Sequence, residues 1–338
     1  MTNGVKRMGL QEETGCVLGV DTSNYTTSIC LLDRDGRIVY EQRRALSVPK
    51  GEHGLMQSAA LFQHVVHLSQ MISQMRPALC SCSLKAIGVS TKPRSQQGSY
   101  MPVFRAGDLA AQSIGVGASV PVIETNHQSG HIMAGLITAK MDVDFGESFL
   151  VIHLSGGTTD MLLVTRDHHD FQVQLLASSL DLHVGQYVDR IGVQLGLPFP
   201  AGKHLERLAR DWEEKELPYL PSAVREGSPS FSGPLSAAQR LHESGIPHAA
   251  IAAAVQRSVA TTIEKMLRHA FFNTGIKRAL LVGGVASNQT IQQRLRKRFG
   301  MDATSSGALN FCAPQYASDN AFGVAHIART ALDPWFSK

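Results

Sequence analysis

The sequence predicts an α/β protein made of two similar halves, each opening with three strands and continuing into helices. The first half starts with an apolar strand at residues 16–23 that ends in a polar turn, and the second starts with an apolar strand at 149–155 that leads into Gly156-Gly157. Alternation of short apolar runs with helical patterns is typical of α/β folds. The two halves share their order of elements rather than repeated residues.

The elements of the first half follow from their hydrophobic patterns. Short apolar runs bounded by polar turns indicate strands. Apolar residues three or four positions apart, as at Leu61, Val65 and Leu68, indicate a helix. We expect Pro77 to end this helix, because proline lacks the amide hydrogen that a helix interior needs. Strands are expected at 16–23, 26–32, 38–44, 85–90 and 120–124, and helices at 55–75, at 107–117 and after residue 124.

The second half is interrupted by a stretch at 197–234 that is rich in proline, glycine and charge, which indicates an insertion with helical pieces. A last helix is expected at 317–329, beginning near Asp319. Strands are expected at 149–155, 160–165, 171–177 and 278–282, and helices at 184–195, 249–272 and 289–299. The expected domains are a polar tail at 1–15, a first lobe at 16–145, a second lobe at 146–304 with an insertion at about 197–248, and a segment at 305–338 that returns to the first lobe.

The composition is that of an ordinary globular protein. The chain has 338 residues, of which 43% are hydrophobic and 18% charged, enough apolar material for a packed core in roughly two domains. No apolar run reaches the length of a membrane span, and the polar start lacks the apolar middle of a secretory signal. We therefore expect a cytoplasmic protein. Its five cysteines are odd in number and form no paired C-x-x-C framework, so reduced, mostly buried thiols are expected.

The net charge of +4 permits contact with polyanions without requiring it. Basic residues cluster at Arg43-Arg44 and at 294–298. Such runs are usually solvated helix faces. The alternative is a surface that neutralises RNA phosphates without reading sequence.

Two histidines and a distant carboxylate form a candidate metal site. His127 and His131 are four residues apart, so on a helix they lie on one face and can share an ion. Asp319 would complete a two-histidine, one-carboxylate set with open coordination positions. Without the carboxylate, two hydrogen-bonded helix histidines would be the simpler interpretation.

Glycine turns form a candidate phosphate site. Gly156-Gly157 directly follows a buried strand and Gly283-Gly284 precedes Asn288, and in each turn the missing Cβ permits a ligand to approach backbone amides. A simple tight turn remains the alternative for each.

Eight short motifs resemble those of the tRNA N6-threonylcarbamoyladenosine transferases, once called O-sialoglycoprotein endopeptidases. They span most of the chain in the family's order, at 19–23, 127–131, 154–157, 185–189, 195–202, 231–233, 283–288 and 318–320. The resemblance implies the fold of actin, sugar kinases and heat-shock-chaperone ATPases, with two RNase H-like lobes and a nucleotide cleft between them.

The resemblance also implies site residues. In the family, the residues matching His127, His131 and Asp319 bind iron or zinc. An ATP or adenylate nucleotide would contact the residues at the family's nucleotide positions, which are Leu154, Ser155, Gly156, Gly157, Asp189, Gly202, Gly284 and Asn288. From the residues alone, Asp189 could equally be an exposed charge.

The chain departs from the family at residues that are expected to transfer protons in the reaction. The family's Cys-Asp-Glu-Thr is replaced by Asn24-Tyr25-Thr26-Thr27, so two carboxylates are missing, and neither Tyr25 nor Thr26 is a base near neutral pH. A threonine, Thr158, stands in place of a histidine, and residues 92–95 (Lys-Pro-Arg-Ser) replace a glycine-rich turn. These changes indicate a divergent member whose catalytic base is unknown. His183, Asp160 or the substrate itself could accept the proton.

Three functions remain open. The first is metal-dependent transfer of a threonylcarbamoyl group from threonylcarbamoyl-AMP to the N6 amine of adenosine in tRNA, usually with a partner protein or as a homo-oligomer. The second is carbamoyl transfer to a small-molecule acceptor. The third is a weakly catalytic nucleotide-binding scaffold. A metalloprotease is not expected, because H-x3-H lacks the glutamate base of H-E-x-x-H.

Overall fold

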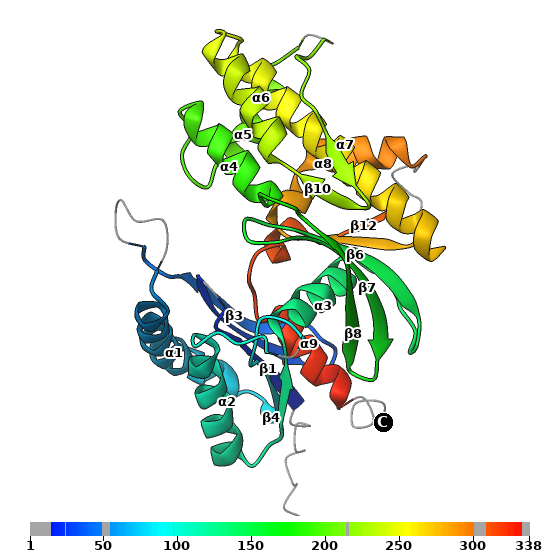
Figure 1. Ribbon diagram of the computed structural model, residues 1–338. Coiled ribbons are helices and arrows are strands. Elements are labelled where there is room, and N and C mark those ends of the chain that lie inside the picture. The colour runs from blue at the N-terminus through cyan, green and yellow to red at the C-terminus, as the bar shows by residue number, and fades with distance from the viewer. Residues whose placement is uncertain are drawn as a thin grey trace, which may run out of the picture. The chain divides into compact units, whose positions relative to one another are not determined.

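The structure is a computed structural model, described for residues 15–23, 25–48, 55–96, 98–213, 216–300 and 309–332. The tail expected at 1–15 lies outside the described residues except for Gly15, and Asn24, 305–308 and 333–338 lie outside them too. The chain divides into two compact units, residues 1–130 with 319–338 (unit 1) and residues 131–318 (unit 2). Each unit contains one five-stranded sheet (Figure 1).

The sheet of unit 1 has the strand order β3-β2-β1-β4-β5. Its first three strands form an antiparallel meander, β4 pairs with β1 in parallel, and β5 pairs with β4 in parallel. The strands are β1 (Gly15–Asp21), β2 (Thr26–Asp33), β3 (Ile38–Ala45), β4 (Ser83–Ser90) and β5 (Val122–Thr125). All five lie where the apolar runs predicted them.

Helices cover both faces of this sheet. Helices α1 (Gln57–Leu79) and α2 (Phe104–Ala118) pack on the face formed by Leu18, Val20 and their neighbours. The C-terminal helix α9 (Phe322–Ala331) packs on the opposite face. Its close approach depends on glycine, because a Cβ at Gly19 would lie 2.5 Å from the carbonyl oxygen of Ala321.

Two expectations for these helices were wrong. Helix α1 continues through Pro77 to Leu79. The Cys80 amide donates to the Arg76 carbonyl at 3.0 Å, so the helical hydrogen bonding carries on past the proline. Helix α9 begins at Phe322, so Asp319 belongs to the preceding loop rather than to the helix.

The sheet of unit 2 has the order β12-β11-β6-β7-β8. It again contains an antiparallel meander, β6-β7-β8, with β11 and β12 added in parallel. The strands are β6 (Ser148–Leu154), β7 (Thr159–Asp167), β8 (Asp170–Ser178), β11 (Ala279–Val282) and β12 (Leu309–Phe311). The sequence did not predict β12, which has only three residues.

The helices of unit 2 surround the long buried helix α7, which packs against α5, α6 and α8. They are α4 (Val184–Gln194), α5 (Gly202–Arg210), α6 (Ser232–Glu243), α7 (His248–Thr274) and α8 (Gln289–Arg298). Helix α3 (His127–Ala139) contains the point at which the chain divides.

The stretch at 197–234 was predicted to contain helical pieces, and α5 and the start of α6 lie there. It also contains an unpredicted hairpin, β9 (Ala223–Arg225) and β10 (Ser228–Ser230). Both residues of its turn, Glu226 and Gly227, have positive φ, as a two-residue hairpin turn of this hand requires.

The expectation of five reduced thiols was wrong for one pair. Cys16 and Cys82 form a disulfide, while Cys30 and Cys312 are buried thiols and Cys80 is an exposed one. Counting cysteines missed this pair because the pairing of β1 with β4 brings together residues that are far apart in sequence.

None of the helices in the described ranges is long and apolar enough to cross a membrane.

Candidate metal centre and nucleotide site

Helix α3 is held at its first residue by the segment that follows β4. The amide of His127 donates to the carbonyl oxygen of Lys92 at 3.0 Å, and that of Gln128 donates to Pro93 at 3.0 Å. These bonds satisfy two of the amides that a helix start leaves unpaired. Because these bonds use backbone carbonyls, the positioning of His127 does not depend on the side chains of Lys92 and Pro93.

The structure brings the three expected metal ligands together. His127 and His131 lie one turn apart on α3, and Asp319 lies in the loop before α9. One potential ligand atom from each residue lies within 4.8 Å of the other two, and no other such group of three occurs among the described residues. The His127 Nε2 atom is 3.4 Å from Oδ1 of Asp319.

A buried carboxylate orients His127. The Nδ1 atom of His127 is 3.2 Å from Oδ1 of Asp21, which is fully buried at the end of β1. Asp21 also accepts hydrogen bonds from the hydroxyls of Ser23 and Ser90. Because Nδ1 is held by Asp21, Nε2 is directed toward Asp319. Metal-bound histidines commonly have such a carboxylate on the second ring nitrogen.

Asp21 was not predicted as a site residue, although it lies in one of the eight motifs. The available signal was its place at the end of a buried strand, directly before a polar turn. A carboxylate there is buried at a cost unless it has partners.

The charges around His127 favour a cation. Burial would lower the pKa of His127, but the carboxylates of Asp21 and Asp319 outweigh burial and raise that pKa to about 10. Burial would raise the pKa of Asp21, yet His127 and the hydrogen bonds from His127, Ser23 and Ser90 hold it below its usual value. The position between the two carboxylates therefore attracts positive charge, whether a proton or a metal ion.

The donor set fits a divalent ion. Two imidazoles and one carboxylate are the ligands that iron and zinc accept, and they leave positions open for substrate oxygens. The side chains of His127 and Asp319 are 18% and 26% exposed, so the cluster is reachable from solvent. The ring of His153 lies beside that of His131, with the centroids 5.2 Å apart.

The first glycine turn, in unit 2, connects β6 to β7. It is closed by the Ser155 amide, which donates to the Thr158 carbonyl at 2.8 Å. Gly156 and Gly157 are exposed, and no described atom lies within 4 Å of a Cβ built at either residue. Open space beside a glycine turn is what a phosphate-binding turn needs. The Gly157 amide already donates to Oγ of Ser155 at 3.3 Å, a long bond that a phosphate oxygen would replace.

The start of α4 lies against this turn. The amide of Gly185 donates to the Ser155 carbonyl at 3.1 Å, and a Cβ at Gly185 would lie 2.6 Å from the Gly156 nitrogen. Only glycine allows this contact. A helix start next to the turn adds the positive end of the helix dipole, which favours an anion.

The second glycine turn meets the first at the end of β6. Gly283 has φ +95°, and a Cβ there would lie 2.3 Å from the carbonyl oxygen of Leu154. The buried residue Leu154 thus supplies the surface on which the second turn rests. Gly284 is exposed with open space at its Cβ position, so a ligand can approach its backbone.

Asp189 and Gly202 lie together. Asp189 Oδ1 accepts a hydrogen bond of 2.7 Å from the amide of Ala201, next to Gly202, the first residue of α5. Burial raises the pKa of Asp189, although the hydrogen bond opposes that shift. The carboxylate therefore anchors the start of α5, and this structural role accompanies any contact with a ligand.

Asn288 also has a structural role. Its Oδ1 accepts a hydrogen bond of 3.0 Å from the amide of Ile291, so it caps the start of α8.

The groups considered for proton transfer differ in accessibility. Tyr25 is 37% exposed, whereas Asp160 is 1% exposed and accepts a hydrogen bond from Ser178 at 2.7 Å. His183 is half-buried directly before α4, and its amide donates to Gln186 at 3.1 Å. The burial of Asp160 makes it poorly suited to accept a proton from a substrate.

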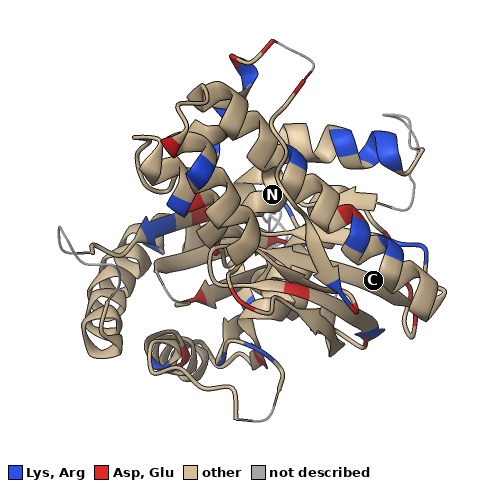
Figure 2. Ribbon diagram, turned by 45° about the horizontal axis from the view of Figure 1, so that its top comes forward, with Lys and Arg blue, Asp and Glu red and all other residues tan. Residues whose placement is uncertain are grey.

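The expected basic clusters are partly structural. On α8, whose charges are visible in Figure 2, Arg298 pairs with Glu264 at 2.9 Å and the Arg296 guanidinium lies 4.7 Å from the centre of the Phe311 ring. Arg43 pairs with Glu41.

Comparisons with known proteins place the chain in context. A family model described as tRNA N6-adenosine threonylcarbamoyltransferase matches residues 40–326. A tRNA N6-adenosine threonylcarbamoyltransferase of Methanopyrus kandleri is 28% identical over 312 residues, covering 92% of this chain and 85% of the relative. A probable bifunctional tRNA threonylcarbamoyladenosine biosynthesis protein of Thermoplasma volcanium is 26% identical over 82% of this chain, but the chain spans only 49% of that protein's length.

Solved structures share the fold. The phosphate- and nucleotide-bound form of HypF has a TM-score of 0.58 at 14% identity, with 96% of this chain and 47% of HypF covered. Component A of the Acidaminococcus fermentans (R)-2-hydroxyglutaryl-CoA dehydratase has a TM-score of 0.53 at 15% identity, covering 96% and 99% of the two chains. The predicted fold of actin, sugar kinases and heat-shock-chaperone ATPases is confirmed, and at these identities the likeness concerns the fold alone.

Proposed function

Since the chain belongs to the tRNA N6-adenosine threonylcarbamoyltransferase family, we propose that it transfers a threonylcarbamoyl group from threonylcarbamoyl-AMP to the N6 amine of an adenosine in tRNA. The observation that carries this proposal is the convergence of His127, His131 and Asp319, with Asp21 behind His127. Family membership alone would not indicate whether this divergent chain retains a competent site.

The three converging residues would hold one divalent ion, iron or zinc. When bound, such an ion supplies a Lewis acid that stabilises negative charge developing on a substrate oxygen. The role of Asp21 is to hold the His127 ring so that Nε2 stays available to a ligand. Ser23 and Ser90, both buried, keep Asp21 in place and ionised.

The glycine turns of unit 2 would bind the nucleotide part of the substrate. Gly156 and Gly284 are exposed residues whose amides would donate to phosphate oxygens, helped by the start of α4. The Gly157 amide would exchange its bond to Oγ of Ser155 for one to the same phosphate. Asp189 and Asn288 each have one oxygen engaged in a helix start, and they would offer their remaining polar atoms to the ribose or the base.

The proton of the attacking amine needs an acceptor. In the reaction a new N–C bond forms at N6, the bond between the carbamoyl carbon and the phosphate oxygen breaks, and AMP leaves. Tyr25 and Thr26 replace the family's carboxylates and cannot accept the N6 proton near neutral pH. We propose that the leaving phosphate accepts it, so that the chain transfers more slowly than relatives that have both carboxylates.

The test combines the purified chain with metal, synthetic threonylcarbamoyl-AMP and unmodified tRNA, with and without candidate partner proteins. Mass spectrometry of the digested tRNA should detect the modified nucleoside. His127→Ala should abolish product and lower bound metal, while the matched control His168→Ala, at a ring that is 80% exposed, should change neither. Absence of product under every condition would contradict the proposal.

Two further results would redirect it. Carbamoyl transfer that proceeds without tRNA would indicate a small-molecule acceptor. Full metal binding without any transfer, even in the presence of partner proteins, would indicate a scaffold. A faster reaction of Tyr25→Glu would show that the missing carboxylate limits the rate.

A further inference from the structure

A pocket in unit 2 is lined by residues that neither candidate site uses. It has a volume of about 370 Å³ and lies among α5, α7 and α8, with Leu217 at one side. This volume is within the range of small-molecule sites. The polar groups that line it and carry the argument are Arg210, Gln256, Arg257 and Arg294.

Two buried polar atoms of this pocket have no partner. Gln256 is only 3% exposed, and its Nε2 donates to the Leu205 carbonyl at 3.4 Å, which directs Oε1 away from that carbonyl. Among the described residues, neither Gln256 Oε1 nor Arg294 Nε has a hydrogen-bond partner. Because buried polar groups are nearly always paired, one unpaired acceptor and one unpaired donor in the same pocket point to a ligand.

Two of the three arginines that line the pocket have no carboxylate partner among the described residues. Arg210 is paired with Glu206 at 3.2 Å. Arg257 donates to the carbonyl oxygens of Leu217 and Pro218, and within the described ranges no carboxylate lies at ion-pair distance from Arg257 or Arg294. Two guanidinium groups without counter-ions favour a dianion.

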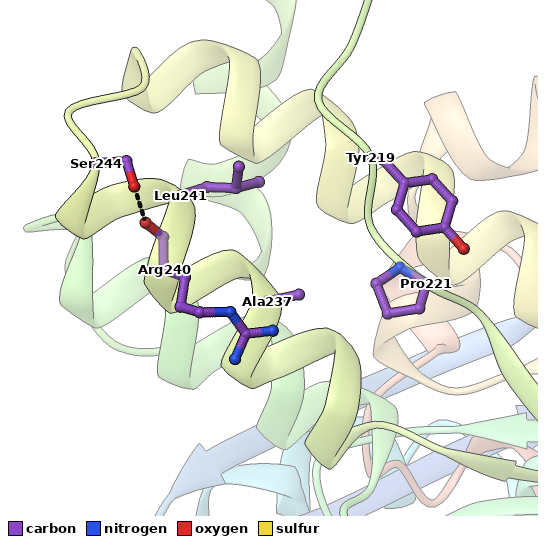
Figure 3. A pocket seen from close by; sticks show the side chains of 6 residues that line it. All are labelled: Tyr219, Pro221, Ala237, Arg240, Leu241 and Ser244. Carbon is purple, nitrogen blue, oxygen red and sulfur yellow. Dashed lines mark hydrogen bonds between the residues drawn. The ribbon is translucent and has the colours of Figure 1, made fainter.

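A second pocket of similar size has fewer positively charged residues in its lining. It has a volume of about 340 Å³, and Figure 3 shows Tyr219 and Pro221 on one side and Ala237 and Leu241 of α6 on the other. Arg240 is the single cation in its lining. That lining lacks the paired guanidinium groups that an anion would need.

We propose that the pocket formed by α5, α7 and α8 is a binding site for a small phosphate monoester that carries a hydroxyl group. The guanidinium groups of Arg257 and Arg294 donate to the phosphate oxygens, as arginine forks commonly do. The hydroxyl donates to Gln256 Oε1. The remaining volume holds the short carbon skeleton that joins the two groups.

The pocket and the candidate nucleotide site both involve helices α5 and α8, but they use different residues of these helices. Helix α5 starts at Gly202 and ends at Arg210, and α8 is capped by Asn288 and carries Arg294. Glu206 accepts from both Arg210 and the Gln289 amide, so one carboxylate links the two helices. A separate experiment must therefore show that the two sites bind independently.

The probe is glycerol 3-phosphate, compared with inorganic phosphate, and binding to the full chain is measured by isothermal titration calorimetry. We expect saturable binding of both, with glycerol 3-phosphate at least several-fold tighter. Arg294→Gln should lower the affinity for both ligands at least ten-fold. The matched control Lys297→Gln, which removes an exposed positive charge from the same helix outside the pocket, should change affinity less than two-fold.

Gln256→Leu tests the acceptor. The substitution should lower the affinity for glycerol 3-phosphate several-fold, because the hydroxyl contact is lost. The affinity for inorganic phosphate should change less, so the difference between the two ligands should shrink. Thermal unfolding of each variant should match that of the unchanged chain to within a few degrees. If Gln256→Leu does not fold, the comparison of Arg294→Gln with Lys297→Gln still tests the proposal.

Four results would overturn the proposal. These are the absence of saturable binding of either phosphate, equal losses in Arg294→Gln and Lys297→Gln, competitive displacement of glycerol 3-phosphate by AMP, and loss of tRNA binding in Arg294→Gln without small-phosphate binding by the unchanged chain. The third would assign the pocket to the nucleotide site, and the fourth would assign its arginines to RNA. None depends on transferase activity, so failure of this proposal and failure of the proposed function are distinguishable.

Discussion

The candidate metal centre and the candidate nucleotide site are constructed in opposite ways. The metal centre depends on side chains from distant parts of the sequence, with His127 held between the carboxylates of Asp21 and Asp319. The nucleotide site depends on the absence of side chains, at Gly156, Gly185 and Gly283. One is sensitive to the loss of a charge, and the other is sensitive to the gain of a methyl group.

This difference affects which substitutions each site tolerates. The turn at 92–95 positions His127 through backbone carbonyls, so its side chains could change without moving the histidine. A side chain that transfers a proton acts through its own chemistry, and no backbone group can replace it. Contacts made through the backbone therefore tolerate side-chain substitutions better than contacts that depend on an ionisable side chain.

The largest expected effect comes from adding a methyl group at the second glycine turn. Gly283→Ala should lower the free energy of unfolding by about 3 kcal/mol, because it combines overpacking with strained backbone. Its Cβ would lie 2.3 Å from the Leu154 carbonyl oxygen at a φ of +95°. Urea unfolding measures the effect.

The neighbouring glycine is the matched control. Gly284→Ala places its Cβ in open space, so its stability should change by less than about 0.5 kcal/mol. Nucleotide affinity should still fall if a phosphate approaches that backbone. Equal unfolding midpoints for the two variants would refute the contrast between them.

At the metal centre, a neutral residue in place of Asp21 should lower the affinity for the metal ion rather than the stability of the fold. Asp21→Asn should lower metal affinity about 10- to 100-fold, as is usual when the partner of a ligating histidine is changed. Competition with a chromophoric chelator measures the affinity. Asp189→Asn, a carboxylate change in unit 2, should leave it unaltered, and a similar loss in both variants would argue against orientation by Asp21.

A smaller effect is expected at Asp181, a carboxylate that belongs to neither site. It accepts hydrogen bonds from Ser230, Ser232 and the amides of Phe231 and Leu182, and although burial opposes the shift, these bonds hold the pKa of Asp181 well below its usual value. Asp181→Asn should lower stability at pH 7 by about 1 kcal/mol, a small value because the group is exposed and screened by solvent.

The pH dependence has a definite sign. Since the folded pKa is depressed, the contribution of Asp181 is complete above the unfolded value near 4 and is lost as the pH falls through the folded value. The stability difference between Asp181→Asn and the unchanged chain should therefore be constant from pH 5 to 8 and shrink below about pH 4. A difference that grows on acidification would contradict this account.

Local patterns located most of the fold in advance. The strands of both meanders and the long helices were predicted, because apolar runs and helical spacing reflect burial directly. Where tertiary contacts determine the structure, the local patterns gave a wrong prediction or none. Examples are the continuation of α1 past Pro77, the three-residue strand β12 and the disulfide of Cys16 with Cys82.

The candidate sites divide in the same way. The helical spacing of His127 and His131 placed both on one face, and the glycine motifs and the order of eight motifs pointed to the family that the comparisons then showed. The sequence did not indicate that Asp21 holds His127, or that Arg257, Arg294 and Gln256 line one pocket.

The sequence by itself determined the fold class, the family and the residue types available for chemistry, because hydrophobic periodicity and motif order are local properties of the chain. Only the tertiary structure decided which of those residues meet, since the parallel pairing of β1 with β4 brings Ser90 to Asp21 and the return of the C-terminus brings Asp319 to His127. These two contacts join residues 69 and 192 positions apart, and at such separations burial and packing, rather than any local pattern, select the partners.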